Sequence, residues 1–341
     1  MHDSRERPTA LRAMSSLIAV GFCVIALAEL GIGRPDWLLR AVPRGDLSLL
    51  SFALDEAVVE PNPDARILIL GTSRARGAFL PTVMESKLGL ERGQVVNLAI
   101  GGVHVQESAW LYDQARKTLS HARTLVLQVD PFSFSGSRPI TDRQCEWMSW
   151  SDRAALGGLR AAQAFACGVF QLQHRRPLLR WWITTWLGKH RAPAQVELDR
   201  YGRAAMVRIA DDHVPEEFSP ERFRYWLDYY YRGFVWSPVY ERHFLDLVRL
   251  ARADGVEVIV VHLPVVPGYL DAARALPGRP YQQFEERLPA LVDGLARVQI
   301  WERPEELGLR FRDFRDWGHL NTPGAERLSV AFSAWMKGGA S

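Results

Sequence analysis

Residues 65 to 76 read ARILILGTSRAR, and this stretch decides the predicted fold. The four apolar residues Ile67 to Leu70 form an unbroken run, which is typical of a strand buried on both faces of a parallel sheet. The triplet Gly71-Thr72-Ser73 then ends the strand. Open α/β sheets bind ligands at the carboxyl ends of their strands, so this turn would expose Ser73 at the start of the next helix. The pattern predicts a nucleophilic serine, and a plain turn with a helix cap is the alternative.

A second motif lies near the other end of the chain, in FRDFRDWGHLNTPGAERL from Phe311 to Leu328. Asp316 and His319 are three residues apart, so both side chains can face the same way on one turn. A serine hydroxyl needs a base to take its proton, and a carboxylate holds that imidazole in the required tautomer. Ser73, His319 and Asp316 therefore supply the parts of a catalytic triad. Asp313 is a competing carboxylate, although it lies six residues from the histidine.

The two motifs together resemble the SGNH (GDSL-like) hydrolases. In that family a Gly-Asp-Ser or related triplet follows the first strand, and Asp-x-x-His lies near the C-terminus. Gly71-Thr72-Ser73 matches the first block and Asp316-Trp317-Gly318-His319 matches the last. The apolar stretch VVNLAIGG at 95–102 looks like the second block. The resemblance implies an oxyanion hole formed by the backbone N–H groups of Ser73 and Gly102.

The third block of the family departs from the pattern. These enzymes usually carry Gly-x-Asn after the third strand, whereas this chain has LVLQVDP at 125–131. The asparagine that helps to form the oxyanion hole is therefore missing. The resemblance covers roughly residues 64–131 and 236–336.

Strands alternate with helices in the rest of the chain, which predicts an α/β fold with a parallel sheet and right-handed crossovers. We expect a three-layer α/β/α sandwich of the SGNH or flavodoxin-like kind. Strands are predicted at 67–70, 95–100, 124–129, 256–261 and 298–301, and helices at 78–88, 108–119, 240–253, 284–296 and 325–336.

The N-terminal segment has the features of a membrane anchor. Residues 13–28 carry no charge, and three arginines precede them. About 20 apolar residues can cross a hydrocarbon core, and preceding basic residues keep that end in the cytoplasm. We expect residues 1–34 to be a transmembrane helix, with a signal peptide cut near Ala26-Leu27-Ala28 as the alternative. The rest of the chain would then lie on the periplasmic or extracellular side of the cytoplasmic (inner) membrane.

The predicted SGNH-like domain spans residues 64–341 and follows a juxtamembrane connector at 35–63. Residues 132–235 interrupt the α/β alternation, so we expect a helical insertion rich in Trp and Tyr. Insertions at the carboxyl edge of a sheet often build a lid or a substrate groove, where aromatic rings could stack on sugars. A small subdomain core is the alternative. Residues 176–190 are apolar with basic ends and could also rest in the headgroup region of a membrane.

Several further side chains are candidates for contact with substrate. Arg74 and Arg76 follow the candidate nucleophile and could hold an anionic substrate. Alternatively, they could only pair with Asp130 or Asp313. Asp130 and His262 end predicted strands at the same edge of the sheet, so both could also contact substrate. A satisfied edge histidine is the alternative for His262. His104 could line the site or belong only to a loop.

Composition limits the partners of the protein. A net charge of +3 over 341 residues is too even to predict binding to nucleic acid. The three cysteines lack metal-ligand spacing, and only Cys145 and Cys167 could form a disulfide. The sequence contains no phosphate-binding glycine loop, His-Glu-x-x-His or Cys-x-x-Cys. We therefore expect no metal and no cofactor.

The resemblance also implies a place of action. Family members with an N-terminal anchor are similar to the alginate and cellulose O-acetylation proteins and to the D-alanyl transfer protein of teichoic acids. They imply a serine O-acyltransferase or esterase that acts on acyl, chiefly acetyl, esters of a cell-surface polysaccharide. A multispanning membrane-bound O-acyltransferase would be the partner. A simple carboxylesterase and a non-catalytic scaffold that binds glycan or a partner are the alternatives.

Overall fold

The computed structural model describes residues 23, 62–138, 148–169 and 220–338 of the chain. It divides into two compact units. The smaller comprises Met1–Pro43 and Ile140–Arg191, and the larger comprises Arg44–Pro139 and Ala192–Ser341. All candidate site residues lie in the larger unit.

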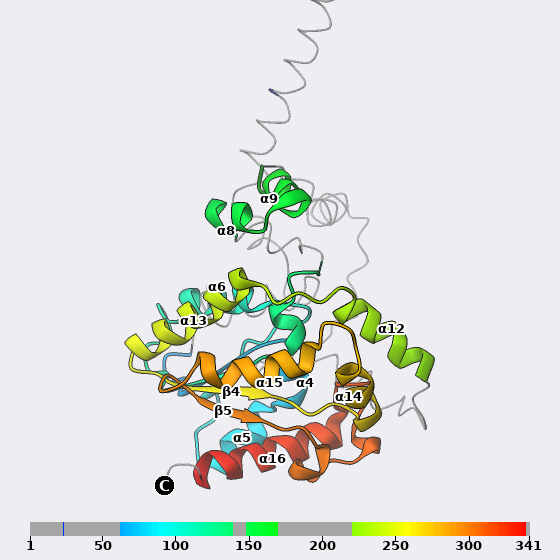
Figure 1. The fold of residues 1–341 in the computed structure, drawn as a ribbon. Coiled ribbons are helices and arrows are strands. Elements are labelled where there is room, and N and C mark those ends of the chain that lie inside the picture. Colours follow the sequence, from blue (N-terminus) through cyan, green and yellow to red (C-terminus); the bar gives the residue numbers. More distant parts are fainter. Residues whose placement is uncertain (1–22, 24–61, 139–147, 170–219, 339–341) are drawn as a thin grey trace, which may run out of the picture. The chain divides into compact units, whose positions relative to one another are not determined.

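A five-stranded sheet forms the centre of the larger unit (Figure 1). Its strands are β1 (Ile67–Leu70), β2 (Val95–Asn97), β3 (Thr124–Gln128), β4 (Glu257–His262) and β5 (Arg297–Ile300). The order is β2-β1-β3-β4-β5, and every neighbouring pair is parallel. The prediction of an α/β fold with a parallel sheet is confirmed. The winding reverses between β1 and β3, and open sheets bind ligands at the carboxyl ends of strands at such a point.

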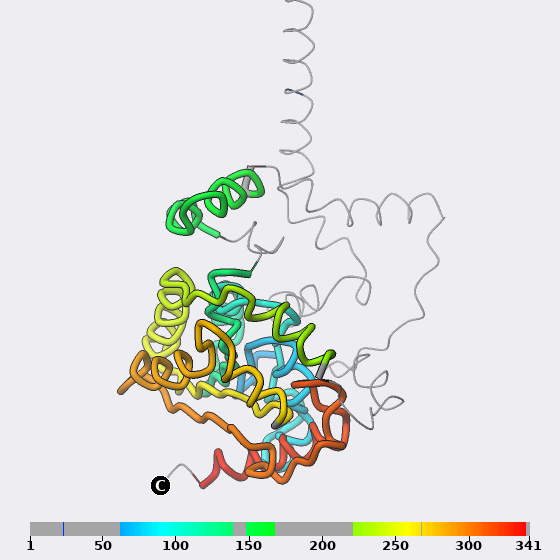
Figure 2. Tube along the Cα trace, turned by 45° about the vertical axis from the view of Figure 1, so that its right-hand side comes forward, coloured from blue at the N-terminus to red at the C-terminus, as the bar shows by residue number. Residues whose placement is uncertain are grey.

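Helices cover both faces of this sheet, as Figure 1 and the turned view in Figure 2 show. On one face α5 (Pro81–Leu88) packs against α16 (Thr322–Gly338). On the other face α6 (Val105–Ala115) packs against α13 (Pro238–Ala253), which also contacts β4. The residues of β1 are buried on both sides, as the unbroken apolar run predicts.

One predicted helix is two helices in the structure. We expected a single helix over 78–88 after the serine, but α4 (Ser73–Ala78) ends before α5 begins at Pro81. Proline cannot donate an N–H and disfavours helical geometry in the residue before it. Leu80 is accordingly extended, with φ −96° and ψ 106°. The break leaves Ser73 on a helix of only six residues.

Other elements differ from prediction mainly at their ends. Helix α6 begins at Val105, three residues earlier than expected, because Glu107 accepts a hydrogen bond from the N–H of His104 and so caps the helix. Helix α15 (Pro280–Leu291) begins four residues earlier than expected, at a proline. Three short elements were not predicted: α14 (Pro267–Arg274), η4 (Pro304–Leu307) and η5 (Phe311–Asp313).

The expected insertion at 132–235 divides between the two units. The larger unit holds η3 (Pro131–Phe134) and α12 (Pro220–Tyr231), and the smaller unit holds α8 (Trp150–Ala155) and α9 (Gly158–Val169). In the smaller unit Met148, Ala164 and Cys167 form a small apolar core, packed against Leu156. Cys167 takes part in a disulfide, and its expected partner Cys145 lies outside the described residues.

Among the described residues, no helix is long and apolar enough to span a bilayer. The predicted anchor at 1–34 lies outside these residues, apart from Cys23, which is a free and exposed cysteine. The apolar segment at 176–190 also lies outside them.

Gly71 is a position where the fold requires glycine. Its φ is +144°, and a Cβ there would come within 2.8 Å of the side chain and the carbonyl of Gln128. We expect Gly71→Ala to lower the free energy of unfolding by about 1–3 kcal/mol, since the backbone is strained and the neighbour cannot retreat. Denaturation in urea, followed by tryptophan fluorescence, measures the change.

The matched control is Gly77→Ala in the adjacent helix. A Cβ at Gly77 meets nothing within 4 Å, and alanine is the better helix former by up to about 1 kcal/mol. Equal stability of both variants would contradict the assigned tight approach of the β1 turn to β3.

Candidate active site

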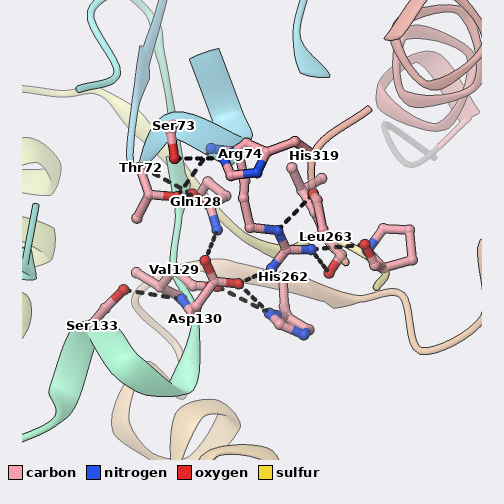
Figure 3. Close-up of polar contacts among 12 residues, drawn as sticks. Thr72, Ser73, Arg74, Gln128, Val129, Asp130, Ser133, His262, Leu263 and His319 are labelled. Atoms are coloured by element: carbon pink, nitrogen blue, oxygen red, sulfur yellow. Dashed lines mark hydrogen bonds and ion pairs between the residues drawn. The ribbon is translucent and has the colours of Figure 1, made fainter. Parts of the chain in front are cut away.

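Ser73 is the first residue of α4, and two residues separate it from the end of β1. The side chain of Thr72 accepts a hydrogen bond from the N–H of Arg74 at 3.2 Å and so caps the helix. The hydroxyl oxygen of Ser73 lies 2.7 Å from Nε2 of His319 (Figure 3). The structure therefore brings together two predicted residues that are 246 positions apart in the sequence.

Asp316 contacts the other side of the imidazole. Nδ1 of His319 lies 2.8 Å from one carboxylate oxygen of Asp316 and 2.9 Å from the other. The backbone N–H groups of Gly318 and His319 donate to the same carboxylate at 3.0 and 2.8 Å. His319 thus lies within hydrogen-bond distance of both other predicted triad residues.

The charge of Asp316 fixes the tautomer of the histidine. Burial raises the pKa of this carboxyl, but the His319 imidazole and the two backbone N–H groups outweigh burial and lower the pKa to about 2. An ionised carboxylate can only accept, so Nδ1 carries the proton and Nε2 is left to accept from the Ser73 hydroxyl. This is the arrangement that general-base activation of a serine requires.

The loop that carries Asp316 and His319 is closed by its own backbone and anchored by Trp317. The N–H of Arg315 donates to the carbonyl of His319 at 2.8 Å. The Trp317 ring is buried and stacks on Tyr269 at 4.5 Å between centroids, and its carbonyl accepts from the N–H of Val266 at 3.0 Å. The loop that carries the histidine is therefore anchored by a buried side chain.

Asp313 is occupied elsewhere. Its carboxylate pairs with Arg327 and accepts the N–H of Arg310 at 2.7 Å. Of the two carboxylates that could have served His319, the structure places only Asp316 against the imidazole.

Arg74 does not lie where a substrate-binding residue would. Its side chain is only 1% exposed, and its guanidinium pairs with Asp130. The remaining donors reach the carbonyls of Leu263, Pro264 and Gly318 at 2.6, 2.7 and 3.1 Å (Figure 3). The geometry argues against the predicted role in holding an anionic substrate and supports the alternative, pairing with Asp130.

Asp130 and His262 are also buried beside the site and turned toward protein partners. Burial raises the pKa of Asp130, but the charge of Arg74 and a hydrogen bond from His262 outweigh burial, so the pKa lies below its ordinary value. Nδ1 of His262 lies 3.2 Å from the Asp130 carboxylate and 3.1 Å from the carbonyl of Val129. Neither side chain has the exposure that the predicted contact with substrate needs, because both are satisfied internally.

Arg76 and His104 are likewise part of the packed fold. Arg76 donates to the carbonyl of Ala99 at 3.4 Å, and burial lowers its pKa to about 10. His104 is 1% exposed and stacks on Tyr240 at 4.6 Å between ring centroids. These contacts tie the segment after β2 to its neighbours and argue against direct roles in binding.

The predicted oxyanion donors are backbone groups. Gly102 lies in the turn after β2 with φ +73°, a conformation that glycine adopts without strain, and it is exposed. Within the described part of the chain, the N–H groups of Ser73 and Gly102 donate no hydrogen bond.

Sequence reasoning missed the role of Gln128. Its amide oxygen accepts from the N–H and the hydroxyl of Thr72 at 3.0 and 2.8 Å, and its NH₂ donates to Asp130 at 2.8 Å. The signal was the position itself, because Gln128 stands at the end of β3, where the SGNH hydrolases that the sequence resembles carry the block with asparagine. The parts played by Gly318 and Trp317 had no sequence signal beyond lying between the two triad residues.

Across the described residues, no group of three or more His, Cys, Asp and Glu side chains is placed to hold a metal ion.

Comparisons with known proteins add little beyond this geometry. No family model matches the sequence, and no curated protein matches it. Among solved structures the chain is similar to a candidate acylhydrolase from Bacteroides fragilis, with a TM-score of 0.37 and 10% sequence identity. The match covers 91% of this chain and 98% of that one. A similarity this low carries no functional argument, so function is argued from the site alone.

The lowered pKa of Asp316 predicts how stability depends on pH. A carboxyl whose pKa is lower in the folded state stabilises the fold above its unfolded pKa, and this contribution is lost as pH falls through the folded value. The change from 3.8 to about 2 corresponds to about 2 kcal/mol, lost between roughly pH 4 and pH 2. We expect Asp316→Asn to remove this part of the acid dependence, measured by urea denaturation at several pH values.

The exposed carboxylate of Asp64 provides the control. Asp64→Asn should leave the acid dependence of wild-type protein unchanged. If the free energy of unfolding of Asp316→Asn falls with pH as steeply as that of wild type below pH 4, the assigned interaction of Asp316 with His319 is wrong.

Proposed function

We propose that this protein is a serine-dependent ester hydrolase or O-acyltransferase of the SGNH type. One observation carries the proposal: Ser73 Oγ lies 2.7 Å from Nε2 of His319, whose Nδ1 lies 2.8 Å from Asp316. A serine, a base and an orienting carboxylate at these distances are the parts of a nucleophilic triad. Their place at the carboxyl end of β1, beside the switch in winding, is where such sheets bind ligands.

In the first step Ser73 attacks the carbonyl carbon of an ester. His319 takes the hydroxyl proton at Nε2 as the new bond forms, and Asp316 stabilises the resulting imidazolium. In this proposal the N–H groups of Ser73 and Gly102 bind the negative oxygen of the tetrahedral intermediate. His319 then returns the proton to the leaving alcohol, which leaves an acyl-serine.

The second step decides between hydrolysis and transfer. Water or the hydroxyl of an acceptor loses its proton to His319 and attacks the acyl-serine, and the proton then returns to Ser73. The products are a carboxylic acid with water and a new ester with an acceptor. The same triad can carry out hydrolysis and transfer. Which reaction occurs depends on whether water or an acceptor hydroxyl is bound next to the acyl-serine.

The 2.7 Å contact favours an enzyme over a non-catalytic scaffold. A scaffold needs no base within hydrogen-bond reach of the serine, whereas the proposed chemistry does. A simple carboxylesterase is the second candidate, and it needs no acceptor site.

The aromatic face of α12 supports a polysaccharide as the substrate. Tyr225 and Tyr229 are 62% and 56% exposed and lie one turn apart on this helix. Their neighbour Tyr230 contacts Trp317, the buried anchor of the triad loop, at 5.2 Å between ring centroids. Exposed aromatic rings can cover the apolar faces of sugar rings. The exposed tyrosines are therefore connected to the loop of the catalytic histidine through two packed rings.

We also propose the expected setting of the enzyme: a single-pass membrane anchor, a domain outside the cytoplasm, and a multispanning O-acyltransferase as partner. The support for these is the charge-free segment at 13–28 with its preceding arginines.

The central test is Ser73→Ala in the full-length chain, purified in mild detergent. We expect turnover of p-nitrophenyl acetate to fall by about 10³-fold or more, because the nucleophile is lost, while the melting temperature stays close to wild type. Labelling of wild-type protein by a fluorophosphonate probe should also disappear in the variant.

Ser151→Ala is the control, since Ser151 is an exposed serine of α8 in the smaller unit. It should retain wild-type turnover and labelling. If the Ser73→Ala protein keeps most of the wild-type turnover and fluorophosphonate labelling, Ser73 is not the nucleophile.

The aromatic face of α12 has its own test. Replacing Tyr225 and Tyr229 by alanine should lower kcat/KM for O-acetylated cellohexaose by about tenfold, since each lost ring contact is worth roughly 0.5–1.5 kcal/mol. Turnover of p-nitrophenyl acetate, which has no sugar ring to stack on these tyrosines, should stay near wild type. Replacing both residues by phenylalanine keeps the rings and should keep both activities. Equal losses on the two substrates, or none on either, would exclude this face as a sugar-binding surface.

A further inference from the structure

We infer that the buried Arg74–Asp130 ion pair is a positioning device for the proposed reaction, which holds Ser73 and His319 at hydrogen-bond separation. The inference rests on the proposed function. Neither Arg74 nor Asp130 contacts the reacting atoms, since their side chains are each 1% exposed and bonded within the protein.

The guanidinium of Arg74 joins chain segments that lie far apart in sequence. Nη1 pairs with Asp130 after β3, and Nη2 donates to the carbonyls of Leu263 and Pro264 after β4 at 2.6 and 2.7 Å. Nε donates to the carbonyl of Gly318 at 3.1 Å. Gly318 precedes the catalytic histidine, so one side chain connects the helix of the nucleophile with the loop of the base.

The loop approaches Arg74 closely. A Cβ on Gly318 would come within 2.9 Å of Nε of Arg74, so only glycine fits here without a shift. The guanidinium also lies 5.5 Å from the centre of the Trp317 ring, within the range of a cation–π contact. The position of the His319 loop is therefore set against this guanidinium by both polar and aromatic contacts.

Asp130 is connected to both sequence neighbours of Ser73. One of its oxygens pairs with Arg74, and the other accepts from the amide of Gln128 at 2.8 Å. Gln128 in turn accepts from the N–H and the hydroxyl of Thr72 at 3.0 and 2.8 Å. Both sequence neighbours of Ser73 are thus attached to one carboxylate, Arg74 directly and Thr72 through Gln128 (Figure 3).

The contacts of Asp130 with Arg74 and, through Gln128, with Thr72 form a circuit around Ser73 and restrict the position of this serine. A displacement of the Asp130 carboxylate would move Thr72 and Arg74 together and would change the distance from Ser73 to His319. Misplacement by about 1 Å can cost roughly 10²-fold in rate even when the reacting groups are intact. The pair therefore acts on turnover through geometry.

Conservative variants separate this role from bulk stability. Arg74→Lys keeps the charge, but an ammonium group cannot reach four acceptors on three segments as a planar guanidinium does. Asp130→Asn keeps the shape and removes the charge that Arg74 needs. Thr72→Val removes the hydroxyl contact to Gln128 together with the cap that this hydroxyl gives the N–H of Arg74, and it leaves the ion pair in place.

The matched control is Glu85→Gln. Glu85 is a buried carboxylate that accepts the N–H groups of Gly93 and Val95 at 2.7 and 3.1 Å, near the amino end of β2. Its replacement should lower the melting temperature without touching the site. It measures what loss of a buried carboxylate alone does to turnover.

The experiment is steady-state hydrolysis of p-nitrophenyl acetate by full-length wild type and the four variants, at a temperature where all are folded by circular dichroism. We expect kcat to fall by about 30-fold or more in Arg74→Lys and Asp130→Asn, and by about fivefold in Thr72→Val, with KM within about threefold. Glu85→Gln should keep kcat within about twofold. If the three site variants also keep kcat within about twofold, or if the control loses as much as they do, the inference is overturned.

The failure of the proposed function would be recognised separately. If wild type shows no Ser73-dependent turnover, that function fails, and crystal structures of wild type and Asp130→Asn then decide the inference. A Ser73 Oγ to His319 Nε2 separation that lengthens from 2.7 Å to beyond about 3.5 Å supports positioning by the pair. An unchanged separation overturns it. Should Asp130→Asn fail to fold, the same measurement on Arg74→Lys, which alters the pair from its other side, decides the question.

Discussion

The ion pair between Arg74 and Asp130 is the interaction on which the site depends. Charges removed from water cost free energy unless every donor and acceptor finds a partner. Meeting that demand here fixes the ends of β3 and β4, the helix of the nucleophile and the loop of the base in one arrangement. The same contacts that make the buried charges tolerable therefore also set the geometry of Ser73 and His319.

The strand order makes this meeting possible. β3 lies between β1 and β4, so the chain segments after all three strands emerge side by side at one edge of the sheet. Ser73 follows β1, Asp130 follows β3 and Leu263 follows β4. The loop of His319 is brought to the same edge by Trp317. The Trp317 ring packs on Tyr269, and the Trp317 carbonyl accepts a hydrogen bond from the N–H of Val266, which lies shortly after β4. Parallel topology thus supplies proximity, and the ion pair turns it into a fixed distance.

The sequence predicted the parallel sheet and the pairing of Asp316 with His319 because both have local signals. Apolar runs such as Ile67 to Leu70 mark buried strands, and the spacing of Asp316 and His319 is visible on one turn. The burial of Arg74 could not be read in this way. A guanidinium beside an exposed serine resembles a ligand-binding group until the fold shows that its four acceptors come from three distant segments. The pairing with Asp130 was one of two open alternatives, and only the neighbouring positions of β1 and β3 decide it.

Gln128 explains why the block with asparagine can be absent. In this structure both ends of its amide bond within the site: the oxygen accepts from Thr72, and the NH₂ donates to Asp130. The side chain at the end of β3 therefore supports the turn that carries Ser73, and in the proposed mechanism the N–H groups of Ser73 and Gly102 stabilise the tetrahedral intermediate. One donor of this kind is typically worth about 10²–10³-fold in kcat. A site with backbone donors alone must rely more heavily on accurate placement of its serine, and such placement is what the Arg74–Asp130 circuit provides.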